Sequence, residues 1–376
     1  MSAEPTVFLS AGEASGDQHG AELARALRAR LPGVRLAGLG GSAMAGEGVE
    51  LLAGLDRLAV LGFAEVVRHL PDLLALRKEV RSFLRREGVD LLIPIDYPGF
   101  NLPLASWAHA RGLAVLYYIA PQVWAWHESR AKRLARVADE VCVVLPFEEA
   151  FLRGYGARAR FVGHPLLDRA PGAAAAGRGT GRSATSGPLL GLFPGSRRQE
   201  VKRMLPVFLE AGRRLQVETP GLTLAVARSA DLPASLFSDV GPVRVLDPDV
   251  VAAESTAAIT KSGTITLQLA LADVPMVVGY RVNPLTFAFA RRLVRVPHIA
   301  LVNLVAGREI VPERIQGEMT SRALTAAVRP LLDPDSDERR GVRDGLADVR
   351  ARLGERGAAG RVAEVAAGLL ERRGQA

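Results

Sequence analysis

Short apolar runs alternate with amphipathic helical stretches along this chain, and this alternation constrains the fold more than any other feature. Helical stretches such as 20–30 and 102–111 separate the apolar runs of the first half. This order is typical of a parallel sheet with helices on both faces. Pro94 argues against a central position for the strand expected at 89–95, because proline cannot donate to a sheet ladder, unless Pro94 lies at the strand's end. We expect strands at 6–10, 34–39, 89–95, 113–119 and 140–145.

The alternation stops at residues 171–188, which contain Ala, Gly, Ser, Thr and two Arg between their prolines but no large apolar residue. Such a composition predicts a linker. The pattern then restarts, with strands expected at 189–193, 222–227, 243–246, 257–260 and 276–280. The sequence thus predicts an α/β protein with two Rossmann-like domains facing a cleft. We expect an N-terminal domain at 1–170, a linker at 171–188, a C-terminal domain at 189–340 and C-terminal helices at 341–376.

Composition and charge narrow the choice of partners. The 376 residues are 48% apolar and 23% charged, which suffices for two globular cores. Net charge is +8 and uneven: residues 1–169 hold 20 Lys/Arg and 19 Asp/Glu, against 28 and 21 from residue 170 onward. A basic second half fits a phosphorylated ligand or an anionic membrane. Nucleic acid fits poorly, because aromatic residues make up only 5% and no known binding module is present.

Five loops follow expected strands, at the edge where open parallel sheets bind ligands. They span residues 12–17, 96–101, 121–127, 195–200 and 261–264. The last two each open a helix, whose free N–H groups attract phosphate oxygens, and Arg197 can clamp such oxygens. Either loop alone is often only a capped helix. Two in one domain favour a diphosphate ligand.

Asp96 ends a very apolar run, so its carboxylate is expected to be poorly hydrated, as is typical of a general base with a raised pKa. A helix N-cap is the alternative for Asp96, and equally for Asp17 in the loop 12–17. That loop lacks the GxGxxG pattern of dinucleotide-binding domains. The histidines lack metal-ligand spacing, so we expect no metal site.

Two stretches combine apolar and basic residues with few acidic ones. Within 58–86, apolar residues lie on one side of a helix, and Arg77, Lys78 and Arg81 lie largely on the other. The stretch 284–296 carries three arginines beside apolar residues. Such helices usually pack on their own domain. Helices that lie on an anionic membrane surface have the same pattern.

Ten motifs, in order from about residue 6 to 320, resemble those of one family, the lipid-A-disaccharide synthases. The first and fourth together are highly specific for this family of inverting glycosyltransferases with the GT-B fold. The motifs are Ala11-Gly-Glu-Ala-Ser-Gly-Asp17, Leu58-Ala-Val-Leu-Gly62, Ile95-Asp-Tyr-Pro-Gly-Phe-Asn101, Tyr117-Tyr-Ile-Ala-Pro-Gln-Val-Trp-Ala-Trp126, Leu145-Pro-Phe-Glu148, Phe161-Val-Gly-His-Pro165, Pro194-Gly-Ser-Arg197, Ser262-Gly-Thr264, Pro275-Met-Val-Val-Gly-Tyr-Arg281 and Leu301-Val-Asn-Leu-Val-Ala-Gly-Arg308.

The resemblance implies a reaction. It joins UDP-2,3-diacylglucosamine, an acylated sugar donor, to 2,3-diacylglucosamine 1-phosphate, an acylated sugar-phosphate acceptor, and gives a β(1→6) disaccharide and UDP. The C-terminal domain then holds UDP and the N-terminal domain holds the acceptor, without a metal or cofactor. It also implies that the protein is cytoplasmic and peripherally associated with the inner face of the cytoplasmic membrane, where it contacts an anionic membrane surface. The resemblance does not decide whether the protein forms a homodimer.

The resemblance also assigns residues to the site. Asp96 is expected to be the catalytic base, with Asp17 as a second catalytic residue. The residues expected to bind substrate are Ser15, Gly16, Asn101, Gln122, Trp124 and Trp126. Those expected to bind UDP are Gly195, Ser196, Arg197, Ser262, Gly263, Thr264, Gln268, Tyr280 and Asn303.

Two positions depart from the family pattern. An acidic residue is usual where Gly99 stands, and Glu is usual at Gln268, where GT-B enzymes bind the ribose. Gln can bond one hydroxyl but cannot accept from two as a carboxylate can. Two other functions fit the same fold: a UDP-sugar epimerase, and a non-catalytic sugar-nucleotide-binding module.

Overall fold

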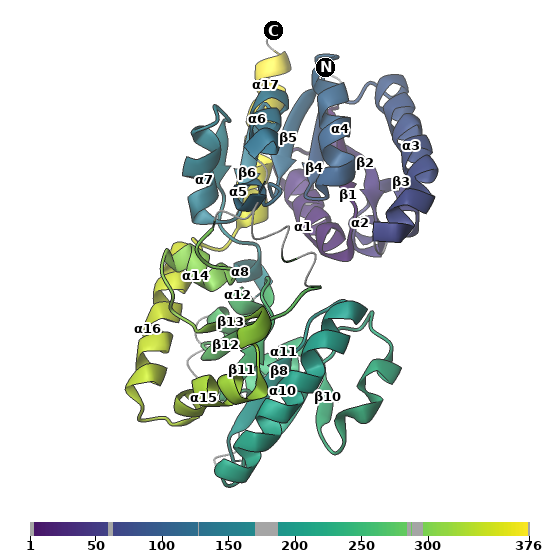
Figure 1. The fold of residues 1–376 in the computed structure, drawn as a ribbon. Helices are drawn as coiled ribbons and strands as arrows, with labels where there is room; N and C mark the ends of the chain where they lie inside the picture. The colour runs from purple at the N-terminus through teal and green to yellow at the C-terminus, as the bar shows by residue number, and fades with distance from the viewer. Residues whose placement is uncertain are drawn as a thin grey trace. The chain divides into compact units, whose positions relative to one another are not determined.

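Each half of the chain forms its own parallel sheet in the computed structural model, which describes residues 4–58, 63–126, 128–169, 187–283, 287 and 296–374. The chain divides into two units (Figure 1): unit 1 is Met1–Asp168 with Gly354–Ala376, and unit 2 is Arg169–Leu353. The C-terminal helices divide between them. Helix α16 (Asp337–Arg352) belongs to unit 2 and α17 (Ala358–Gly374) to unit 1.

The sheet of unit 1 has seven strands in the order β3-β2-β1-β4-β5-β6-β7, and all of its recorded pairs are parallel. All five strands expected in this half are present. Strands β3 and β7 were not expected; both are short and only partly buried. The strands are β1 (Thr6–Ala11), β2 (Arg35–Gly40), β3 (Glu50–Gly54), β4 (Leu91–Ile95), β5 (Ala114–Tyr118), β6 (Glu140–Val143) and β7 (Ala159–Phe161).

Pro94 is the penultimate residue of β4, a central strand between β1 and β5. Its register partner on β1 is Ser10. On the β5 side, pairing is recorded at Leu91, Leu92 and Ile95 but not at Pro94. Pairing on this side is interrupted at both Ile93 and Pro94, close to the strand's end, where a central strand tolerates the missing N–H of a proline.

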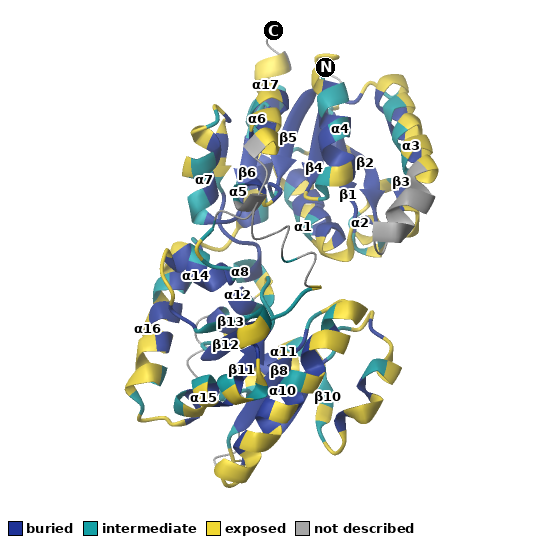
Figure 2. Ribbon diagram, viewed as in Figure 1, coloured by how far each residue is buried: buried dark blue, intermediate teal, exposed yellow. Residues whose placement is uncertain are grey.

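Helices flank this sheet, and the strands of both sheets are largely buried while the helices expose one side (Figure 2). Helix α17 packs against α1 and β5. The helices of unit 1 other than α17 are α1 (Ala14–Arg30), α2 (Ser42–Gly46), α3 (Phe63–Arg86), α4 (Pro98–His109), α5 (Val123–Trp126), α6 (Glu128–Val137), α7 (Pro146–Arg153) and the short α8 (Leu166–Arg169), whose last residue is assigned to unit 2.

Helix α3 packs most of its described apolar side chains into its own unit. Leu76 and Val80 are buried in the core cluster of unit 1. The guanidinium of Arg77 lies 5.2 Å from the ring centre of Phe100, and a similar contact joins Arg81 to an aromatic ring of α4. These arginines therefore cover aromatic faces as well as carrying charge.

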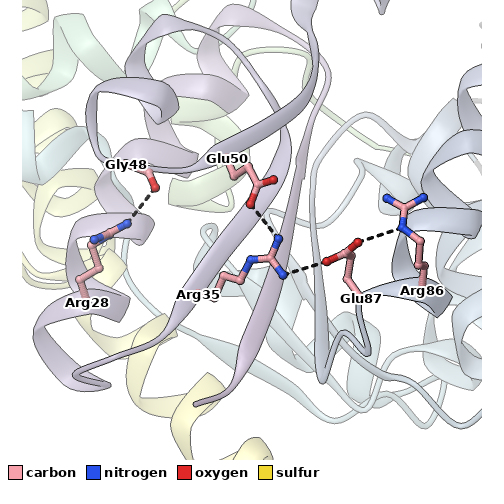
Figure 3. A network of polar contacts seen from close by, with 6 residues as sticks. All are labelled: Arg28, Arg35, Gly48, Glu50, Arg86 and Glu87. Carbon is pink, nitrogen blue, oxygen red and sulfur yellow. Dashed lines mark hydrogen bonds and ion pairs between the residues drawn. The ribbon is translucent and has the colours of Figure 1, made fainter. Parts of the chain in front are cut away.

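A chain of ion pairs ties the end of α3 to the sheet (Figure 3). Glu87 accepts hydrogen bonds from Arg35 of β2 at 3.0 Å and from Arg86 at 2.9 Å, and Arg35 also donates to Glu50 of β3 at 2.9 Å. Hydrogen bonding to Arg35 lowers the pKa of Glu87. Nearby, Arg28 donates to the carbonyl of Gly48. Because these groups are exposed, the network fixes positions more than it adds stability.

The sheet of unit 2 has the order β10-β9-β8-β11-β12-β13, again with parallel pairs. All five expected strands are present, and only the three-residue β13 was missed. Its strands are β8 (Leu189–Phe193), β9 (Thr223–Ala227), β10 (Arg244–Leu246), β11 (Ala257–Thr260), β12 (Met276–Tyr280) and β13 (Glu313–Ile315). Its helices besides α16 are α10 (Arg198–Glu218), α11 (Pro248–Glu254), α12 (Ile265–Leu271), α14 (Leu301–Ala306) and α15 (Ser321–Leu332).

Both sheets reverse their strand order at the first strand of the unit. In unit 1 the reversal lies between β1 and β4, and in unit 2 between β8 and β11. Such switch points, at the carboxyl ends of the strands, are where doubly wound sheets bind ligands. Four of the five predicted loops follow these four strands.

Candidate active site

The loops after β1 and β4 meet at the switch point of unit 1. Ala11 at the end of β1 is paired with Ile95 at the end of β4, so Gly12 and Asp96 begin neighbouring loops. The loops touch: a Cβ atom on Gly12 would lie 2.3 Å from the ring of Tyr97. Glycine is needed here because the ring occupies the place of a side chain.

The chain turns sharply at Asp96 and Tyr97, whose φ angles of 46° and 47° lie in the left-handed region. The carbonyl oxygen of Asp96 accepts hydrogen bonds from Asn101 Nδ2 and from the Tyr117 hydroxyl, each at 2.8 Å. The hydroxyl of Tyr97 donates to the carbonyl of Leu58 at 2.8 Å. Consecutive non-glycine residues in this region are strained, and such strain is typical of functional sites where the surroundings enforce it.

Asp96 is exposed as a residue, yet the surrounding protein removes much of the hydration of its carboxyl. This loss raises its pKa to about 6, and the negative charge of Glu13 acts in the same direction, while a backbone hydrogen bond at Tyr97 opposes both. At neutral pH the group is mostly ionised and has a pKa suited to accepting a proton. Its exposed surface lets a substrate hydroxyl reach it.

Asp17, the second residue expected to be catalytic, has different surroundings from those of Asp96. It lies in the first turn of α1, is 5% exposed, and caps the start of α2 rather than its own helix. A carboxylate that already holds three donors braces the fold, which sets it apart from Asp96. Its donors are the backbone N–H groups of Gly41 (2.6 Å), Ala43 (3.0 Å) and Met44 (3.1 Å). Nearby, Gly16 is buried and Ser15 is exposed.

Asn101 is fully buried and faces the backbone of its own unit. Its Oδ1 accepts from the Ser10 hydroxyl at 2.7 Å, and its Nδ2 donates to the carbonyls of Ser10 (3.0 Å), Ile95 (3.3 Å) and Asp96 (2.8 Å). With no exposed surface, Asn101 joins β1 to the turn at Asp96 and supports the site from behind.

The aromatic segment after β5 is held by a glutamate. Trp124 is half-buried; its Nε1 donates to Glu148 Oε1 at 2.9 Å, and its ring meets that of Phe147 edge-on at 5.1 Å between centres. Gln122 is exposed. The side chain of Trp126 lies outside the described residues. The segment after β5 thus contacts the segment after β6.

The loops after β8 and β11 meet at the switch point of unit 2. Gly195 (φ 121°) and Gly263 (φ 146°) adopt backbone conformations that L side chains rarely take. Lys261 Nζ lies 3.3 Å from Glu200 Oε1, which joins the two loops. Glu200 Oε2 accepts from the backbone N–H groups of Ser196 (3.2 Å) and Arg197 (3.3 Å).

Arg197 is exposed beside these groups. Tyr280, at the end of β12, lies close by: burial raises the pKa of its hydroxyl, the charge of Glu200 adds to this, and Arg197 opposes it. The three loop ends therefore form one cluster on unit 2. Among the described residues, no group of three or more His, Cys, Asp or Glu is placed to hold a metal ion.

The other residues expected to bind UDP differ in exposure. Thr264 is exposed and Gln268 half-buried, while the Ser262 hydroxyl donates to the carbonyl of Ile299 at 2.6 Å. Asn303 is fully buried. Its partners lie within unit 2: the carbonyl of Val311 and Glu313 Oε1 accept from Nδ2, and the N–H groups of Ile310 and Val311 donate to Oδ1.

Glu148 and Lys261 belong to these clusters but were not assigned from the sequence. Glu148 stands three residues after Leu145, where the apolar run of β6 gives way to a helix, so it could be read as a capping glutamate. Lys261 directly precedes the assigned residues 262–264. For Glu148, only its burial and its bond to Trp124 show a link to the site.

Comparisons with known proteins identify the family. A model of the lipid-A-disaccharide synthetase family matches residues 7–358. The lipid-A-disaccharide synthase of Myxococcus xanthus is 40% identical over 380 residues, covering 98% of this chain and 99% of that protein. The protein of the same name from Sodalis glossinidius is 43% identical over 354 residues, covering 90% and 92%.

Solved structures confirm the fold class. The glycotransferase of kitacinnamycin has a TM-score of 0.67 at 18% identity, covering 98% of this chain and 99% of that chain. UDP-GlcNAc 2-epimerase from Neisseria meningitidis bound to UDP-GlcNAc has a TM-score of 0.65 at 10% identity, covering 98% and 100%. At these identities the likeness shows the fold alone, the two Rossmann-like domains of the GT-B type, as expected. The sequence relatives decide the family: this chain belongs to the lipid-A-disaccharide synthases, which are glycosyltransferases.

Proposed function

We propose that this protein transfers the sugar of UDP-2,3-diacylglucosamine to 2,3-diacylglucosamine 1-phosphate, which gives the β(1→6)-linked lipid A disaccharide and UDP. Family membership over nearly the whole chain supports the reaction. The observation that carries the mechanism is Asp96, an exposed residue whose carboxyl has a raised pKa, in a strained turn at the switch point of unit 1.

In this mechanism the acceptor 6-hydroxyl attacks the anomeric carbon from the face opposite UDP, and α becomes β through an oxocarbenium-like state. Asp96 takes the hydroxyl proton as the new C–O bond forms. General base catalysis of this kind contributes roughly 10²- to 10⁴-fold to the rate. The hydrogen bonds from Asn101 and Tyr117 fix the backbone of Asp96, so little reorganisation is needed.

The donor is assigned to unit 2. UDP leaves as an anion, so it needs charge stabilisation rather than a protonating acid. Arg197, the neighbouring Lys261 and the loop 262–264 supply positive charge and N–H donors in one cluster. Gln268 in α12 is assigned to the ribose, with one accepting oxygen instead of two.

Because position 99 holds glycine, Asp96 is the one acidic residue in the stretch 96–99. A Cβ atom on Gly99 would meet no described atom within 4 Å. The fold therefore has room for the acidic residue that is usual in the family, and its absence reflects this chain's sequence rather than steric exclusion. Asp96 is then the sole base that we assign in this turn.

Product analysis tests the proposal. Incubation with acylated donor and acceptor, followed by mass spectrometry, should yield the disaccharide and UDP in equal amounts. A UDP-sugar epimerase would convert the donor without the acceptor, and a binding module would bind UDP without turnover. An altered donor without a disaccharide, or no turnover, would overturn the transferase assignment.

Acylated substrates imply work at a membrane surface, and we assign the protein to the cytoplasm, attached to the inner face of the cytoplasmic membrane. No helix among the described residues is long and apolar enough to cross a bilayer. Leu74 is 51% exposed on α3, and Lys78, one turn later on the same side, is also exposed. They combine apolar insertion with attraction to anionic lipid. The second basic stretch, 284–296, lies outside the described residues except for Phe287 and Val296.

A further inference from the structure

We infer that Glu148 is a positioning residue whose carboxylate fixes the indole of Trp124, and with it the segment 121–126, beside the Asp96 turn. Trp124 belongs to the segment assigned to the acceptor, so the inference deepens the proposed function and rests on it for the acceptor alone. The contact between Glu148 and Trp124 can be tested without any substrate.

The contacts divide the carboxylate between two elements. Glu148 Oε1 accepts from Trp124 Nε1 at 2.9 Å, and Oε2 accepts from the backbone N–H of Leu145 at 3.1 Å, at the start of α7. The ring of Phe147 meets Trp124 edge-on. The hydrogen bond and the ring contact together restrict both the position and the tilt of the indole.

The burial of Glu148 is more than a helix cap requires. A capping glutamate does its work at the surface, whereas Glu148 is 2% exposed. Burying a carboxylate is costly unless its oxygens are paired. Here one oxygen serves the helix and the other serves Trp124, which assigns the side chain to the aromatic segment as well as to its own helix.

Near neutral pH the Glu148 carboxyl is close to its pKa, so its protonated and ionised forms are both populated. Burial raises its pKa to about 7; the hydrogen bonds from Trp124 and from the N–H groups of Leu145 and Val144 oppose this, and the negative charge of Asp96 adds to it. Asp96, after β4, is the charged group that acts on it among the described residues. The protonation of Glu148 therefore responds to the charge of Asp96, in addition to burial and hydrogen bonding.

This coupling links the aromatic segment to the proton transfer. When Asp96 takes the proton of the acceptor hydroxyl, its negative charge disappears. The ionised form of Glu148 then becomes more favourable and bonds more strongly to Trp124.

Tryptophan fluorescence tests the contact. The emission of the wild-type protein should change in one step between about pH 6 and pH 8, as expected for a pKa of about 7. Trp124→Phe and Glu148→Gln should each abolish the step. Glu149→Gln is the matched control: Glu149 lies on the same helix and accepts from the N–H of Phe161 at 3.0 Å, and this variant should keep the step.

A wild-type protein without the step, or a step that survives in either Trp124→Phe or Glu148→Gln, would overturn the inference. If Glu148→Gln fails to fold by circular dichroism, the comparison of wild type with Trp124→Phe still decides. Loss of the step in Glu149→Gln would show a general change in α7 and would also overturn it.

Steady-state kinetics test the consequence for the acceptor. Glu148→Gln and Trp124→Phe should each raise the acceptor KM by roughly 2- to 10-fold, the equivalent of one hydrogen bond. The double variant should lose no more than the worse single one, because both act through one contact. Effects that multiply, or a lower kcat with an unchanged KM, would contradict positioning. Failure of the transferase reaction in the wild type would refute the proposed function and leave the fluorescence result to judge the contact.

Discussion

The two switch points occupy the same place in the same topology, yet their loops carry opposite chemistry. In unit 1, loss of hydration raises the pKa of the Asp96 carboxyl to about 6, and burial raises that of Glu148 to about 7. In unit 2, the nearby acid Glu200 is bonded to Lys261 and to two backbone N–H groups, and Arg197 is exposed. One edge is suited to accepting a proton and the other to binding an anion. The fold supplies the place, and the loop residues supply the chemistry.

Removing the base should have the largest effect. Asp96→Asn keeps the size of the side chain but cannot accept the hydroxyl proton, so turnover should fall by about 100-fold or more. UDP affinity, measured by isothermal titration, should stay unchanged because UDP is assigned to unit 2. Asp56→Asn, at an exposed position of the same unit, is the control. Near-normal turnover in Asp96→Asn would contradict the proposal that the sheet edge of unit 1 supplies the catalytic base.

Removing Arg197, the arginine that we assign to the diphosphate, should act on both affinity and rate. Arg197→Ala should weaken UDP binding and lower kcat/KM by roughly 10- to 100-fold, as expected for the loss of hydrogen bonds to a charged group. Arg214→Ala removes an exposed arginine of α10, the helix that follows Arg197; it is paired with Glu210 and remote from the loop, and its loss should leave UDP binding unchanged. An unchanged Kd for UDP in Arg197→Ala would refute the diphosphate interpretation of 195–197.

The pH dependence of stability should come from unit 1. The folded-state pKa of Glu148 is raised from 4.5 to about 7, so its contribution to stability is fully present below pH 4.5 and is lost as pH rises through 7. Between pH 4.5 and pH 8, the free energy of unfolding of the wild type should therefore fall, relative to that of Glu148→Gln, by up to about 3 kcal/mol.

The tryptophans make this measurement specific. All three, Trp107, Trp124 and Trp126, belong to unit 1, so urea unfolding followed by their emission reports on that unit. Glu149→Gln should show no comparable pH-dependent difference. A constant gap between wild type and Glu148→Gln across this pH range would mean that the burial of Glu148 does not control its protonation.

The strands, and the loops that follow them, could be predicted because their signals are local. Runs such as 91–95 and 257–260 are apolar on both faces, which only a covered parallel strand requires. The short edge strands β3, β7 and β13 have three to five residues and partial burial, so their signal is weak, although β10, equally short and at an edge, was expected. The loops were found because strand ends fix their place in advance.

The direction of a side chain could not be predicted in the same way. Asn101 and Asn303 stand in recognised motifs and were expected to bind substrate and UDP, but both are fully buried and hydrogen-bonded within their units. A motif shows that a residue type matters without showing which way it faces. Asp17 likewise caps α2, a helix that begins 25 residues later, through contacts that no local pattern reveals.

The smallest expected effect concerns membrane attachment, which we assign to α3 of unit 1. Arg77 and Arg81 are poor positions for a test, because their guanidinium groups lie over aromatic rings and their replacement would disturb packing. Leu74 and Lys78 are exposed and can be changed without that cost. Leu74→Ser tests apolar insertion, and Lys78→Glu tests attraction to anionic lipid.

Each basic residue near an anionic bilayer contributes about 1 kcal/mol, screened over roughly 8 Å at physiological salt. Lys78→Glu should therefore lower co-sedimentation with anionic vesicles several-fold at low salt and have little effect at high salt. Leu74→Ser should lower mainly the fraction that remains bound at high salt. Lys132→Glu, which reverses an exposed charge on α6, is the control and should sediment as the wild type does. If neither α3 variant changes sedimentation, then α3 serves only to pack its own unit, and the membrane contact must lie elsewhere on the chain.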